Sequence, residues 1–148
     1  MKIASFTVDH NKLERGIYVS RRDGEVTTFD LRMRRPYAEP VLTETETHSL
    51  EHLLAVALRN GDAGGNVLYV GPMGCATGFY ALFKNMTDEA ALWNVTRAFK
   101  EILVLKEMPG NSKDECGNCF TLDLSAGKRI AEEYLKTLEG KSSPDKYK

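Results

Sequence analysis

The stretch from Thr43 to Gly61 constrains the fold more than any other part of the chain. It opens with Thr43 and with a glutamate three residues later, which is the pattern of a capping box. In a capping box these two side chains accept hydrogen bonds from backbone N–H groups that would otherwise lack a partner at the start of a helix. Apolar residues then recur at helical spacing, at positions 50, 53, 54 and 57. The sequence therefore predicts a helix to about Asn60, which ends at a left-handed Gly61 and packs its apolar side on a sheet.

The same stretch carries two histidines four residues apart. His48 and His52 project from one side of a helix because a turn takes 3.6 residues, and Glu51 lies beside them. Two imidazoles and a carboxylate in this arrangement form a metal-binding pattern in which the acid can transfer protons. The alternative is an ordinary amphipathic helix with two surface histidines. The 148 residues contain three histidines, and two of them are in this motif.

The rest of the chain mixes strands and helices without regular alternation. Asp23-Gly24 predicts a tight hairpin between strands at about 17–22 and 25–34. The remaining expected elements are strands at 66–70, 79–83 and 120–124, and two helices, one from Thr87 to about Met108 and one from Ser125 to Leu138. We therefore predict an α+β fold: a mainly antiparallel sheet with helices packed on one face, in two layers. We expect a single domain over residues 1–148, with a frayed tail at 141–148.

Composition narrows the class of protein. The formal net charge is −1, so bulk charge suggests neither nucleic-acid nor membrane binding, and there is no apolar run long enough to cross a bilayer. The N-terminus becomes polar too early for a signal peptide, and three cysteines do not make a disulfide framework. We expect a protein of the reducing cytoplasm, with thiols free for metal binding or catalysis. At single positions, Arg34 and Arg35 are expected as exposed edge charges, and Trp93 in the core or an interface.

The cysteines suggest how the metal site is completed. Cys116 and Cys119 have the C-x-x-C spacing of a zinc ribbon or redox pair, but the ribbon's second pair and the βαβ context of a redox site are missing. One of these thiols completing a His2Cys set, with an open fourth position, is the better interpretation, and open sites are catalytic sites. Cys75 lies in a glycine-rich loop, where an inert thiol is the simpler reading. A nearby cation would lower the pKa of the Cys75 thiol and would suit this residue to proton transfer.

These motifs, taken together, resemble one family. His48-Ser49-Leu50-Glu51-His52, Pro72-Met73-Gly74-Cys75, Phe29-Asp30-Leu31-Arg32 and Glu115-Cys116-Gly117 occur in the order found in LuxS-type S-ribosylhomocysteine lyases, and Ser5-Phe6 and Asp9-His10 look like the family's N-terminal signature. The resemblance covers nearly the whole chain. It implies a cytoplasmic homodimer with active sites at the interface.

The resemblance also implies a reaction and a set of site residues. The reaction cleaves S-ribosylhomocysteine to homocysteine and 4,5-dihydroxypentane-2,3-dione, the autoinducer-2 precursor of quorum sensing and a step of the methyl cycle. The implied cofactor is one divalent metal per subunit, Fe(II), which Zn or Co can replace. The implied residues are metal ligands His48, His52 and Cys116, acid–base residues Glu51 and Cys75, and substrate-contacting Ser5, His10 and Arg32.

The chain departs from the family pattern, and other functions compete. Residues 66–70 lack the acid that many members carry for the substrate amino group, and Cys119 has no assigned role. H-x-x-E-H is also the motif of inverzincin metallopeptidases, for which Glu132 or Glu133 would be the third ligand. A module that encloses a purely structural metal is the non-enzymatic alternative.

Overall fold

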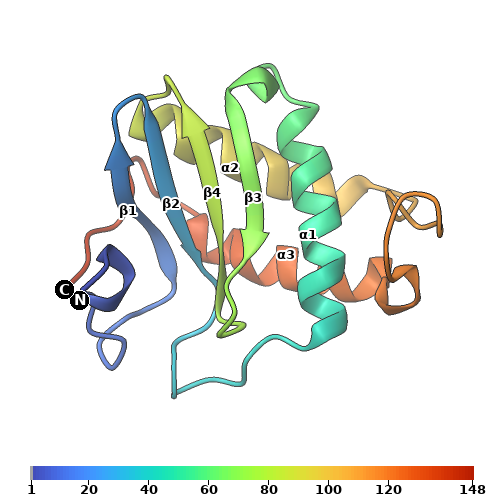
Figure 1. Ribbon diagram of the computed structural model, residues 1–148, viewed down its shortest axis with the longest axis horizontal. Helices are drawn as coiled ribbons and strands as arrows, with labels where there is room; N and C mark the ends of the chain where they lie inside the picture. The colour runs from blue at the N-terminus through green and yellow to red at the C-terminus, as the bar shows by residue number, and fades with distance from the viewer. Residues whose placement is uncertain (1) are drawn as a thin grey trace.

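Four strands form one antiparallel sheet in the order β1-β2-β4-β3 (Figure 1). The computed structural model describes residues 2–148. Its strands are β1 Gly16–Asp23, β2 Val26–Arg32, β3 Val67–Pro72 and β4 Gly78–Lys84, and three α-helices accompany them. The predicted α+β class with an antiparallel sheet is therefore confirmed.

The β1–β2 hairpin forms because Gly24, with a φ of 60°, takes the left-handed conformation that a tight turn needs. β2 then pairs with β4, with Asp30 opposite Tyr80 and Arg32 opposite Gly78. Residues two apart on a strand share a face. Asp30 and Arg32 therefore lie side by side at the end of β2, where the loop between β3 and β4 also turns.

Helix α1, Glu44–Arg59, has the predicted capping box. The Thr43 side chain accepts a hydrogen bond from the Glu46 backbone N–H, and the Glu46 carboxylate accepts one from the Thr43 N–H. Its apolar stripe is buried, as the spacing predicts. The predicted left-handed Gly61 is wrong: its φ is not positive, and the Arg97 guanidinium occupies the space that a side chain at this position would need.

Helices α2, Asp88–Val104, and α3, Leu124–Leu138, lie behind the sheet in Figure 1, and α1 stands beside β3. α2 ends four residues before Met108 because Leu105 is already extended. The predicted strand at 120–124 is wrong. This region holds a 3-10 turn, η3 Cys119–Thr121, and Phe120 is 80% exposed. Two further 3-10 turns are η1 Ala4–Phe6 and η2 Gly64–Asn66.

The positions of Arg34 and Trp93 differ from those expected from the sequence. Arg34 is buried rather than an exposed edge charge, and its Nη1 lies 2.7 Å from Oε2 of Glu133 on α3. Trp93 is 61% exposed, so it does not belong to the core of the chain, and its place in an interface stays a prediction. Strand periodicity alone cannot show that a helix far along the chain supplies an acid to pair with Arg34.

The segment after α3 also differs from the frayed tail that composition suggests. Its Asp145 forms a bridge with Tyr18 of β1, and it exchanges hydrogen bonds with both backbone groups of Ile17. Tyr147 stacks on the Tyr18 ring at 4.5 Å between centroids. None of the helices in residues 2–148 combines the length and apolarity needed to span a membrane.

Candidate metal centre and thiol site

Three predicted site residues meet between α1 and the loop that precedes α3. His48 and His52 lie one turn apart on α1, with their rings edge to face at 4.8 Å. Cys116 approaches from the loop, with its Sγ 3.4 Å from His48 Nε2. One donor atom from each of the three residues lies within 4.8 Å of the others. We call these three residues the donor cluster, and it could hold a metal ion.

The hydrogen bonds behind the two imidazoles fix which nitrogen faces the cluster. His52 Nδ1 lies 2.9 Å from the Pro109 carbonyl oxygen, which can only accept, so Nδ1 carries the proton. His48 Nδ1 lies 2.6 Å from Thr121 Oγ1, whose own proton is donated to the Asn118 carbonyl. With the Thr121 proton directed to Asn118, the hydroxyl oxygen is left to accept from His48 Nδ1. A neutral imidazole with its proton on Nδ1 has its lone pair on Nε2, and this is the form of histidine that binds metal.

A glycine brings the Pro109 carbonyl to His52. Gly110 has a φ of 68°, in the left-handed region, and a Cβ at this position would lie 2.8 Å from His52 Nδ1. A larger residue would meet both backbone strain and a clash. The Met108-Pro109-Gly110 turn, expected only to end a helix, thus supports the donor cluster.

Beside the donor cluster lies a groove of about 380 Å³. Glu51 and His52 of α1, Tyr69 of β3 and Glu115 are among its lining residues. Glu51 and His52 therefore open into the same space, so a molecule held next to His52 would be within reach of the Glu51 carboxylate. The arrangement pairs a possible metal site with a possible proton carrier.

A second group forms around Cys75, in the loop between β3 and β4. Arg32 Nη1 donates to Thr77 Oγ1 at 2.6 Å and lies 4.0 Å from Cys75 Sγ. Because Thr77 Oγ1 accepts from Arg32, its own proton is free to point at the sulfur, 3.1 Å away. We call Arg32, Cys75 and Thr77 the thiol cluster. Ala76, at a φ of 59°, turns the chain so that these side chains meet.

The thiol cluster favours the ionised form of Cys75. Burial raises the pKa of the thiol, but hydrogen bonds from Thr77 and the positive charge of Arg32 outweigh burial, so the pKa lies below its usual value. Arg32 stays charged because Asp30 pairs with it in a bidentate contact, and both residues are almost completely buried. This cation is the one that the sequence interpretation of Cys75 required.

The predicted substrate residues fall near the thiol cluster. His10 lines a cavity of about 250 Å³ together with Cys75 and Thr77, and its Nδ1 donates to the Val8 carbonyl. Ser5, on η1, is close enough to hydrogen-bond Tyr80, which lies opposite Asp30 in the sheet. Ser5 and His10 thus lie on the same side of the sheet end as Cys75, with Arg32 buried beside the thiol.

The two clusters are separate within one chain. In residues 2–148, no hydrogen bond or ion pair joins the thiol cluster to the donor cluster or to Glu51, and the cavity beside Cys75 shares no lining residue with the groove beside His52. The structure therefore gathers the predicted site residues into two groups, each with its own opening.

Sequence reasoning missed several residues that support these groups. Asp30 lies two residues from Arg32 on the same face of a strand, and that spacing could have identified it. Thr77 meets Cys75 across the turn at Ala76, which a strand pattern does not indicate. Thr121 and the Pro109 carbonyl lie far along the chain from the histidines that they contact, and no local pattern indicates them.

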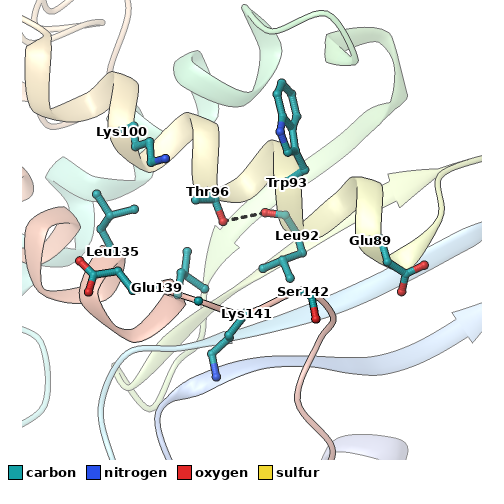
Figure 2. Close-up of a pocket in the computed structure, with 11 residues that line it drawn as sticks. Glu89, Leu92, Trp93, Thr96, Lys100, Leu135, Glu139, Lys141 and Ser142 are labelled. Carbon is teal, nitrogen blue, oxygen red and sulfur yellow. Dashed lines mark hydrogen bonds between the residues drawn. The ribbon is translucent and has the colours of Figure 1, made fainter.

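A further cavity, of about 510 Å³, lies between α2 and the C-terminal end of α3 (Figure 2). Its walls include the exposed Trp93, and the Thr96 hydroxyl donates to the Leu92 carbonyl within α2. Its lining contains two acids and two lysines but no imidazole or thiol. None of the predicted site residues lines this cavity, so the volume of a cavity does not by itself identify the functional site.

The fold and the donor cluster define an α+β protein with a His-His-Cys group able to hold a metal ion. A family model described as S-Ribosylhomocysteinase (LuxS) matches residues 3–144, and the chain belongs to this family. Proteins named S-ribosylhomocysteine lyase are among its relatives. The one from Porphyromonas gingivalis strain ATCC 33277 is 45% identical, over 91% of this chain and 89% of its own. Those from Borreliella afzelii and Clostridium beijerinckii are each 40% identical over 93% of this chain, and over 92% and 91% of their own chains.

Proposed function

We propose that this chain is a metal-dependent carbon–sulfur lyase that cleaves S-ribosylhomocysteine to homocysteine and 4,5-dihydroxypentane-2,3-dione, the autoinducer-2 precursor. The observation that carries the proposal is the donor cluster, in which one donor atom each of His48, His52 and Cys116 lies within 4.8 Å of the others. The family match over residues 3–144 and the names of the relatives supply the substrate.

The donor set fits a divalent metal. Two imidazoles and one thiolate are ligands of Fe(II), Zn(II) and Co(II), and three protein ligands leave a position for substrate. His48, His52 and Cys116 would hold the ion, with Fe(II) as the proposed metal and Zn or Co as substitutes. When bound, the ion would act as a Lewis acid toward the substrate's carbonyl and hydroxyl oxygens.

The remaining chemistry is proton transfer by the chain's own residues. The carbonyl must move along the ribose chain, and each shift takes a proton from one carbon and returns it to the next. Glu51 and Cys75 are proposed as the two carriers, since one is a carboxylate open to the groove and the other a thiol with a lowered pKa. A final proton loss next to the carbonyl expels the homocysteine thiolate from the β carbon.

The separation of the two clusters supports a composite site. We propose that a two-layer subunit pairs with a second copy, so that the thiol cluster of one chain faces the donor cluster of the other. Ser5, His10 and Arg32 would then contact the substrate from the Cys75 side. A two-fold pair makes two identical sites of this kind.

The competing metallopeptidase has less support. Its third ligand would be Glu132 or Glu133, but Glu133 is paired with Arg34, and the cluster that could hold a metal contains Cys116 instead. It also leaves Cys75 without a role.

The test is thiol release from S-ribosylhomocysteine by iron-loaded protein. Wild type should release homocysteine. Cys75→Ala should release none while keeping its metal, and Cys116→Ala should lose the metal, whereas Glu132→Ala should keep it. A structural-metal module is the correct account if neither wild type nor Cys75→Ala releases thiol and both hold metal.

A further inference from the structure

The C-terminal segment reaches a buried ion pair beside the thiol cluster. The Tyr147 hydroxyl donates to Asp30 Oδ2 at 2.6 Å. The same oxygen accepts from Arg32 Nη2 at 2.8 Å, and Asp30 Oδ1 accepts from Arg32 Nε at 3.1 Å. Tyr147 lies outside residues 3–144, which the family model matches, so the family match does not account for this contact.

The segment is held in place by contacts of its own. Asp145 accepts a hydrogen bond from the Ile17 N–H at 3.0 Å, donates its own N–H to the Ile17 carbonyl at 2.7 Å, and pairs with Lys141. Gly16 allows this approach, because a Cβ there would lie 2.5 Å from the Asp145 carboxylate. The Tyr147 ring is stacked nearly parallel on Tyr18. Tyr147 is thus anchored independently of the hydrogen bond that it makes to Asp30.

The contacts continue from Asp30 to Cys75 without a break. Asp30 accepts hydrogen bonds from two nitrogens of the Arg32 guanidinium, and the third nitrogen, Nη1, remains for Thr77 and Cys75. The direction of Nη1 therefore depends on where the Asp30 carboxylate sits. A phenol donating to that carboxylate fixes its rotamer and offsets part of its negative charge, so more of the Arg32 positive potential acts on the sulfur.

We propose that Tyr147 is a positioning residue for Cys75: by donating to Asp30, it holds the Arg32 guanidinium against Thr77 and the thiol. The inference rests on the proposed function for the catalytic role of Cys75. It adds a residue beyond the family-matched region to the machinery, and it makes the C-terminal segment a part of the active site's support.

The test measures how fast iodoacetamide alkylates Cys75 in the metal-loaded full chain at a series of pH values, with peptide mapping to separate Cys75 from the other cysteines. Tyr147→Phe removes the hydroxyl and keeps the stacked ring. Tyr18→Phe is the matched control, because it removes a hydroxyl from the same stack, one that donates to the Glu14 carbonyl and does not contact Asp30. The other charged or titratable groups around Cys75 are the same in both variants; they are Arg32, Tyr80, His10, Tyr37 and Glu39.

Tyr147→Phe should shift the alkylation profile to higher pH and slow alkylation at neutral pH by about three- to tenfold. This is less than the direct loss of a hydrogen bond to a charged group would cause, because the effect reaches the sulfur through Asp30 and Arg32. Its kcat should fall with KM unchanged. Asp145→Ala, which loosens the segment without touching Asp30, should shift the profile in the same direction by less. Tyr18→Phe should match wild type.

The inference is overturned if Tyr147→Phe, folded as shown by a wild-type circular dichroism spectrum, has the alkylation profile of Tyr18→Phe. It is also overturned if Asp145→Ala changes the profile and Tyr147→Phe does not. Failure of the lyase assignment would appear separately, as absence of thiol release by wild type, and would leave the alkylation comparison intact.

Discussion

Replacing Thr121 with valine tests how the donor cluster is prepared for metal. The Thr121 hydroxyl accepts the Nδ1 proton of His48 at 2.6 Å, and valine keeps the shape while removing the acceptor. Without it, the His48 proton can move to Nε2, where it competes with the metal. Loss of such a supporting contact typically costs 10- to 100-fold in metal affinity, or about 1.4 to 2.7 kcal/mol. Because Thr121 is only half-buried, we expect about tenfold.

The assay is a competition titration of Zn(II) or Co(II) against a metallochromic chelator, with Kd compared between variants. Thr96→Val is the matched control, since it removes a hydroxyl that donates within α2 and lines a cavity apart from the site. Thr96→Val should leave Kd unchanged. An unchanged Kd in Thr121→Val would refute the argument that the hydrogen bond behind His48 sets its tautomer.

Three further predictions follow from the supporting geometry. Gly110→Ala should lower the free energy of unfolding in urea by about 1–2 kcal/mol, because alanine is strained in the left-handed conformation. It should also weaken metal binding, because the new Cβ meets His52 Nδ1. A metal affinity equal to that of wild type would contradict this. Thr77→Val should raise the pKa of Cys75, since a hydrogen bond that favours the thiolate is lost, and should move the alkylation midpoint to higher pH; a midpoint at or below that of wild type would be inconsistent. Mixing inactive Cys75→Ala with inactive His52→Ala should restore roughly a quarter of wild-type activity if sites are shared between two subunits, because about half of the dimers are then mixed and each has one intact site. No recovery after subunit exchange would place both clusters of one site in one chain.

Much of the fold follows from local patterns. The hairpin at Gly24 and the capping box at Thr43 are set by residues within a few positions of each other, and both occur as predicted. The errors arise where distant parts of the chain decide the outcome. Glu133 of α3 pairs with the buried Arg34, and the Arg97 guanidinium of α2 fills the space beside Gly61, whose φ is not positive.

The site divides in the same way. The spacing of His48 and His52 on a helix already places both on one side, and the structure adds that Cys116 meets them. What spacing cannot give is the set of supporting contacts: Thr121 behind one imidazole and Tyr147 behind Asp30 come from segments more than 70 residues away in sequence. Such contacts depend on how α3 and the C-terminal segment pack, which is decided by the whole core.

The most direct measurement is a metal titration of catalysis. Metal-free protein is supplied with increasing Fe(II) under anaerobic conditions, and homocysteine released from S-ribosylhomocysteine is followed with a thiol reagent. We predict that activity rises in proportion to bound metal, ends at one ion per chain, and is lost in Cys116→Ala at the same total iron. Thiol release by metal-free protein, or none by protein carrying one ion per chain, would contradict the account.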